Sequence, residues 1–144
     1  MENEDTIKLL RECDSGIKMG ISAIDDVFNS VTDHELSDIL ICAKKEHEEL
    51  EDDLSKLMLE YDVKEKEPGV VAKTMSWVKT NVKLAKNESD KTVASLITDG
   101  CNMGIKSLHR YLNQYENAEK KVKDLVRKTI NVEEHMLGKM MKFL

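Results

Sequence analysis

The sequence predicts an all-α protein, a four-helix bundle of two long antiparallel hairpins with an additional helix in the connection between them. The 144 residues include only six glycines and one proline, so little interrupts long helices. Charged residues make up 35% of the chain and aromatic residues 4%, a balance that excludes an all-β sandwich or barrel. Apolar residues recur at alternating steps of three and four, which places them on one face of each helix. We expect a single domain over residues 1–144.

The first hairpin is predicted from two apolar stripes that a short turn separates. The helix expected at residues 4–29 carries the stripe Ile7, Leu10, Asp14, Ile17, Ile21, Ile24 and Phe28. Thr32 or Asp33 is placed to cap the helix expected at 33–61, and Glu35 would complete a capping box from Thr32. The stripe of this second helix is Leu36, Leu40, Ala43, His47, Leu50, Leu54, Leu57 and Tyr61. Because the turn is short, the two helices should run antiparallel.

Three more helices are expected after the break at Pro68. A shorter helix with a broad apolar face is expected at residues 69–86, and it would form the crossover between the hairpins. Helices at 90–115 and 118–142 would form the second hairpin, with a tight turn near Glu116. A three-helix or solenoid arrangement is the competing architecture, but no short repeat supports it.

Four glycines occur in mid-helix in two matching contexts. Gly16-x-x-Met-Gly20-Ile in the first helix matches Gly100-x-x-Met-Gly104-Ile in the fourth, which suggests a weak internal duplication of the hairpin. A glycine inside a helix costs about 1 kcal/mol relative to alanine, so close backbone approach should compensate for it. We expect tight packing of the first helix on the fourth; the alternative is that the glycines face a ligand.

Polar residues interrupt the inner stripes near mid-bundle. Counted from the turns, Asp14 should lie level with His47, and Asp99 level with Glu133. Glu46, Glu49, Glu134 and His135 flank them. Buried carboxylates need cations, shared protons or basic partners, and carboxylate oxygens with imidazole suit iron or manganese. The alternative is that small helix rotations place these side chains on the surface.

The hairpin–crossover–hairpin order, with acids and histidines at mid-height, resembles the ferritin-like superfamily over nearly the whole chain. The segments Met103-Gly-Ile-Lys-Ser-Leu108 and Tyr111-Leu-Asn-Gln-Tyr115 look most like small bacterial ferritin-like (rubrerythrin-related) proteins. The resemblance implies a di-iron pattern of single carboxylates, here Asp14 and Asp99, and two Glu-x-x-His motifs.

The chain departs from that ferritin-like pattern in both motifs. Glu46 is followed three residues later by Glu49 instead of histidine, and neither Glu133 nor Glu134 has a histidine at that spacing. His47 and His135 are displaced by at least one position, about 100° of helix rotation. The resemblance therefore does not imply ferroxidase or peroxidase activity.

Composition and motifs leave two functions open. One is iron or manganese binding at Asp14, Glu46, His47, Glu49, Asp99, Glu133, Glu134 and His135; the other is a non-catalytic bundle acting through protein contacts, such as homodimerisation. No P-loop, dinucleotide fingerprint or nucleophilic triad indicates an enzyme. Basic residues are not interleaved with aromatic ones, so no nucleic-acid partner is expected. No apolar run could span a membrane, and the three cysteines form no CxxC pair, so we expect a cytoplasmic protein with reduced thiols.

Overall fold

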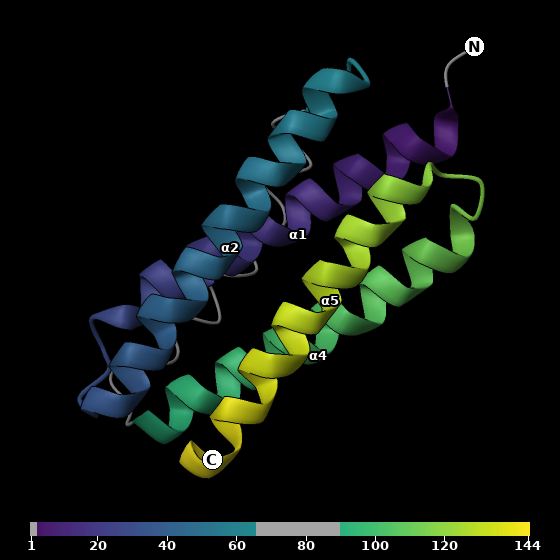
Figure 1. The fold of residues 1–144 in the computed structure, drawn as a ribbon. Coiled ribbons are helices and arrows are strands. Elements are labelled where there is room, and N and C mark those ends of the chain that lie inside the picture. The colour runs from purple at the N-terminus through teal and green to yellow at the C-terminus, as the bar shows by residue number, and fades with distance from the viewer. Residues whose placement is uncertain (1–2, 66–89) are drawn as a thin grey trace.

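The computed structural model describes residues 3–65 and 90–144 and is all-helical over these ranges, without strands. Its helices are α1 (Glu4–Phe28), α2 (His34–Glu60), α4 (Asp90–Gln114) and α5 (Lys120–Met140), followed by a 3₁₀ turn, η1 (Met141–Phe143) (Figure 1). The all-α prediction is confirmed, and each helix falls within two residues of its expected ends. The helix expected at residues 69–86 lies outside the described residues.

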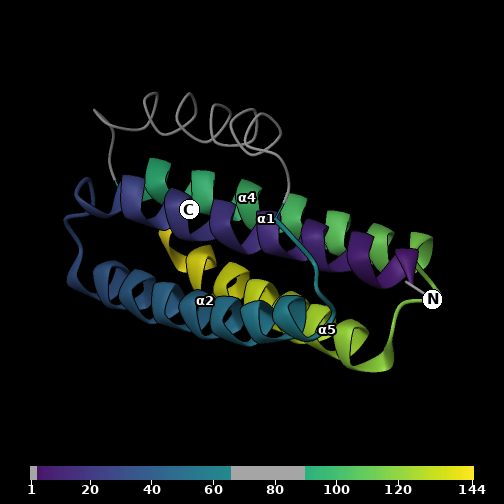
Figure 2. The same ribbon diagram turned by 90° about the horizontal axis from the view of Figure 1, so that it is seen from above.

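The four helices pack as two antiparallel hairpins, α1–α2 and α4–α5. Seen from above, α1 lies beside α4 in one layer, and α2 lies beside α5 in the other (Figure 2). Helix α1 also contacts α5 across the layers. None of the described helices has the length and hydropathy needed to cross a membrane.

The turn between α1 and α2 is organised by two aspartates. Asp33 is the N-cap of α2, and its side chain accepts a hydrogen bond from the backbone N–H of Leu36 at 2.9 Å. Thr32, the alternative cap, instead donates its hydroxyl and backbone N–H to the carboxylate of Asp90, each at 2.8 Å. These bonds lower the pKa of Asp90 and fix the start of α4 against the first turn.

Charge complementarity joins the two hairpins. The first hairpin is rich in acidic residues and α5 is rich in lysine. Three lysines of the second hairpin pair with acids of α2: Lys121 with Glu60, Lys128 with Asp53, and Lys142 with Glu35. All three pairs are exposed, so each contributes little to the free energy of unfolding. Together they favour packing of the first hairpin against the second.

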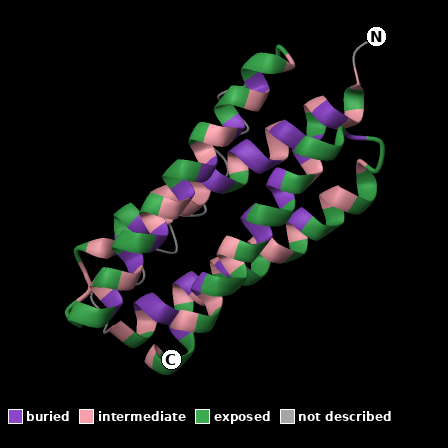
Figure 3. Ribbon diagram, in the orientation of Figure 1, coloured by how far each residue is buried: buried purple, intermediate pink, exposed green. Residues whose placement is uncertain are grey.

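The apolar core consists of two clusters, one towards each end of the bundle. Buried residues recur along each of the described helices (Figure 3). One cluster contains Leu10, Ile17, Leu50 and Ile130, and the other contains Ile24, Leu40, Ala43, Ile97 and Met136. Along every helix the change from one cluster to the other spans about two turns. These two turns of each helix together form the middle layer of the bundle. In this layer the core contains polar side chains and a cavity instead of continuous apolar packing.

Candidate functional site

A buried histidine–glutamate pair occupies the middle layer. The ring of His47 on α2 is fully buried, and its Nε2 lies 2.5 Å from Oε1 of Glu133 on α5. Its Nδ1 lies 2.7 Å from the backbone carbonyl oxygen of Ala43, one turn earlier in α2. Both ring nitrogens therefore have partners, and the ring orientation is fixed from two sides.

The partners of His47 determine where its protons are. The Ala43 carbonyl can only accept, so Nδ1 carries a proton and donates it. The second contact is then either an imidazolium donating to a carboxylate or a carboxylic acid donating to a neutral ring. Burial lowers the pKa of His47, but the hydrogen bond and negative charge of Glu133, with the Ala43 carbonyl, raise it above its ordinary value. In either form the pair shares one proton and has no net charge.

Gly20 of α1 makes room for this ring. A Cβ at Gly20 would lie 3.0 Å from Cδ2 and 3.1 Å from Nε2 of His47, closer than side chains normally approach. His47 is therefore level with Gly20, more than one turn along α1 from Asp14, its expected neighbour. The His47 ring lies over the preceding turn of α2, as its contact with the Ala43 carbonyl shows, so it meets α1 nearer to the connection than counting along the chain predicted.

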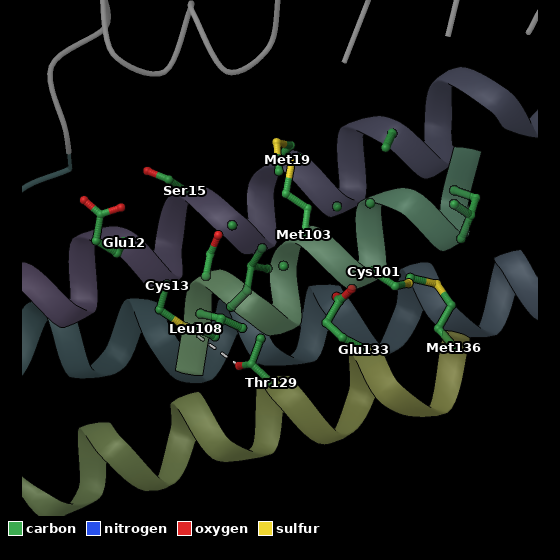
Figure 4. A pocket seen from close by; sticks show the side chains of 18 of the residues that line it. Glu12, Cys13, Ser15, Met19, Cys101, Met103, Leu108, Thr129, Glu133 and Met136 are labelled. Carbon is green, nitrogen blue, oxygen red and sulfur yellow. Dashed lines mark hydrogen bonds between the residues drawn. The ribbon is translucent and has the colours of Figure 1, made fainter. Parts of the chain in front are cut away.

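A cavity of about 340 Å³ lies beside the pair, between α1 and α4 (Figure 4). Its walls are mainly apolar, with Ile17, Ile24 and Leu108 among them, and polar groups enter from Glu133 and Thr129 on α5. In Figure 4 the side chain of Glu133 rises from α5 towards α4. The site thus combines an apolar interior with a partly buried carboxylate.

The four mid-helix glycines all line this cavity. A Cβ at Gly16 or Gly100 would meet no atom of the described residues within 4 Å, and one at Gly104 would meet only Oε2 of Glu133, at 3.8 Å. At these glycines the described residues therefore do not show the expected tight packing of the first helix on the fourth. The close neighbour of Gly20 is instead the His47 ring of α2. Without Cβ atoms, the two helices leave space between them.

Two buried thiols flank the same region. Burial raises the pKa of Cys13 to about 12 although its Sγ lies 3.7 Å from the Thr129 hydroxyl. Burial and the nearby charge of Glu133 raise the pKa of Cys101 further. Burial thus favours the neutral thiol at both positions, so neither is an activated nucleophile. Cys42, the remaining free cysteine, is exposed.

Asp14 belongs to a different polar cluster, between α1 and the end of α2. It is 3% exposed, and Nζ of Lys18 lies 3.1 Å from its Oδ2. Lys18 also lies 2.5 Å from Glu65 and 3.8 Å from Glu51. Burial and the neighbouring Asp14 raise the pKa of Glu51 to about 8. Sequence reasoning missed Lys18 and Glu51, although the spacing of four from Asp14 to Lys18 was available as a signal.

The other expected metal ligands do not join either cluster. Glu49, Asp99, Glu134 and His135 are exposed, and Glu46 is half-buried. Each lies one position from a residue that faces the core or the cavity, and one position of offset rotates a side chain by about 100°. The inward placement predicted for Asp99 is therefore wrong. Over residues 3–65 and 90–144, no three histidine, cysteine, aspartate or glutamate side chains are arranged to hold a metal ion. The eight residues do not fit one iron or manganese centre.

Comparisons with known proteins identify no relative of this chain. No family model matches the chain, and no curated protein or solved structure shows significant similarity to it. The site must therefore be interpreted from its own chemistry.

Proposed function

We propose that this protein is a non-catalytic bundle that binds a small, mainly apolar molecule in the cavity between α1 and α4. The cavity itself is the observation that carries this proposal. Its volume of about 340 Å³ lies within the range of roughly 300–1,000 Å³ that is typical of small-molecule sites. Its lining is likewise typical, since apolar side chains dominate and a few polar groups converge.

The glycines support the same conclusion. Each helical glycine lowers the free energy of unfolding by about 1 kcal/mol relative to alanine. At Gly16 and Gly100 an alanine would meet no described atom within 4 Å, so packing among the described residues does not require glycine there. Room for a bound molecule explains why both helices carry this cost on the faces that line the cavity.

Binding of naphthalene, an apolar probe of suitable size, tests the proposal. We expect the wild-type protein to bind it, as measured by a rise in thermal melting temperature and by chemical-shift changes of the methyl groups lining the cavity. Gly100→Leu should fill the cavity and abolish binding. Gly138→Leu is the matched control, because Gly138 is an exposed α5 residue outside the cavity lining. Equal binding by both variants, or none by the wild type, would overturn the proposal.

The ferritin-like relationship stays a proposal, supported by the two antiparallel hairpins and the histidine–carboxylate contact between α2 and α5. Homodimerisation also stays a prediction, to be tested by sedimentation. Iron or manganese binding is tested by elemental analysis of protein from supplemented cells. Because the expected ligands are dispersed, we expect less than stoichiometric metal, and near-stoichiometric metal that is lost in Glu133→Leu would restore that hypothesis.

A further inference from the structure

The carboxylate of Glu133 has one oxygen engaged and one directed to the cavity side of the bundle. Oε1 contacts Nε2 of His47, and Oε2 is 3.8 Å from the position a Cβ would take on the cavity-lining Gly104. The side chain retains 12% exposure and lines the cavity. Apart from His47, the polar side chain that residues 3–65 and 90–144 bring against Glu133 is the Cys101 thiol, which is a weak donor. Oε2 can therefore accept a hydrogen bond from a bound molecule.

The proton shared with His47 determines the charge that a ligand would meet. If Glu133 is ionised, it faces an imidazolium; if it is protonated, the proton lies between Oε1 and a neutral ring. In both forms the pair is neutral and Oε2 is an acceptor. A hydrogen-bond donor on the ligand is therefore favoured in either protonation form of the pair, whereas a full charge on the ligand is not.

We propose that the cavity binds a neutral apolar molecule carrying one hydroxyl group, an alcohol or a phenol, which donates its hydrogen bond to Oε2 of Glu133. This inference rests on the proposed function and specifies its ligand class. A ligand carboxylate would meet a carboxylate oxygen without a proton between them. A ligand ammonium would lose its hydration in a mainly apolar cavity, and at Glu133 it would gain only a neutral pair in return.

The size of the cavity limits the ligand further. If each non-hydrogen atom takes up a volume comparable to that of a water molecule, roughly 30 Å³, the cavity holds on the order of ten such atoms. A bicyclic phenol or an alcohol of medium chain length meets this limit, whereas long-chain lipids exceed it. 2-Naphthol is a suitable probe because it adds only the hydroxyl group to naphthalene.

Dissociation constants of four related compounds test the ligand class on the wild-type protein. Because a hydrogen bond to a carboxylate contributes more than one between neutral groups, we expect 2-naphthol to bind about tenfold more tightly than naphthalene. 2-Methoxynaphthalene, which has no donor, should lack this advantage, and 2-naphthoate should bind about tenfold more weakly than naphthalene. Equal affinity of naphthol and its methyl ether would overturn the inference.

Two variants of Glu133 assign the effect to its oxygen. In Glu133→Gln the amide can donate to Nε2 of His47 and leave its carbonyl oxygen for the ligand. The bond to the ligand is then one between neutral groups, so the naphthol-to-naphthalene affinity ratio should fall only to about fivefold. In Glu133→Met the ratio should fall to about one. An unchanged ratio in Glu133→Met would refute the role of Glu133. Failure of the proposed function is distinguishable, because naphthalene itself would then not bind to the wild type.

Discussion

Alanine substitutions at Gly16 and Gly20 should change stability in opposite directions, although both glycines lie in the middle of α1. At Gly16 the added Cβ meets no described atom within 4 Å. At Gly20 it would lie 3.0 Å from the His47 ring. The comparison isolates the contact with His47, because both substitutions bring the same gain in helix propensity.

The expected magnitudes follow from those contacts. Gly16→Ala should raise the free energy of unfolding by about 1 kcal/mol, the difference in helix propensity. In Gly20→Ala the ring must shift by a few tenths of an ångström, which disturbs its bonds to Glu133 and Ala43. A disturbed hydrogen bond of a charged buried pair costs about 2–3 kcal/mol, so the net change is a loss of about 1–2 kcal/mol.

Urea denaturation followed by far-UV circular dichroism measures both changes. The gap between the variants should be about 2–3 kcal/mol, or several degrees in melting temperature. Repeating Gly20→Ala in a His47→Ala background completes a double-mutant cycle, and there the alanine should become stabilising. If Gly20→Ala is as stable as Gly16→Ala in the wild-type background, the His47 ring does not lie close enough to Gly20 to oppose an added Cβ.

Three further predictions concern protonation and capping. Because Glu51 has a folded-state pKa of about 8 and the pKa of His47 is also raised, the folded protein binds more protons than the unfolded chain over the range from pH 5 to pH 8. The melting temperature should therefore fall by roughly 10 °C from pH 5 to pH 8. Glu51→Gln should remove most of this fall, and an unchanged slope would contradict the assignment to Glu51. Ellman's reagent should modify one thiol in the native protein, Cys42, and three after denaturation; rapid modification of three in the native state would contradict the burial of the others. Asp90→Ala should lower stability by about 1 kcal/mol in urea denaturation, whereas Asp90→Asn should recover part of it.

The helices were predictable because their signals are local. Stripes at steps of three and four define the buried faces, and Asp33 could be recognised as a cap from its position before the second stripe. The docking of the hairpins was also predictable in outline, since the excess of acid in one and of lysine in the other is visible in the sequence. None of these inferences requires knowledge of how the helices are rotated or shifted against each other.

Which side chains meet in the site depends on how the helices are rotated and shifted against each other, and local sequence signals do not give this. His47 and Glu133 were both expected inside, and both are, but their pairing was not expected, because counting from the turns placed His47 beside Asp14. Asp99 lies next to an inward position, and a single step turned it to the surface. The cavity could not be predicted either. Glycine spacing signals the absence of side chains, and only the distance between the helix axes decides whether close packing or space results.

The middle layer contains two features that each lower stability. A buried ionisable pair is often no more stabilising than well-packed apolar side chains, and replacing such pairs by apolar residues can raise stability. A space of this size between the described helices lacks the dispersion contacts that a packed core provides. Leucine and alanine at these positions would remedy both, and the chain uses such residues in the clusters on either side.

The two costs lie within one layer and adjoin at Glu133, which is both the partner of His47 and part of the cavity wall. A bundle that served only as a scaffold would have no reason to combine them, whereas a site that must admit an apolar molecule and fix its hydroxyl group needs both.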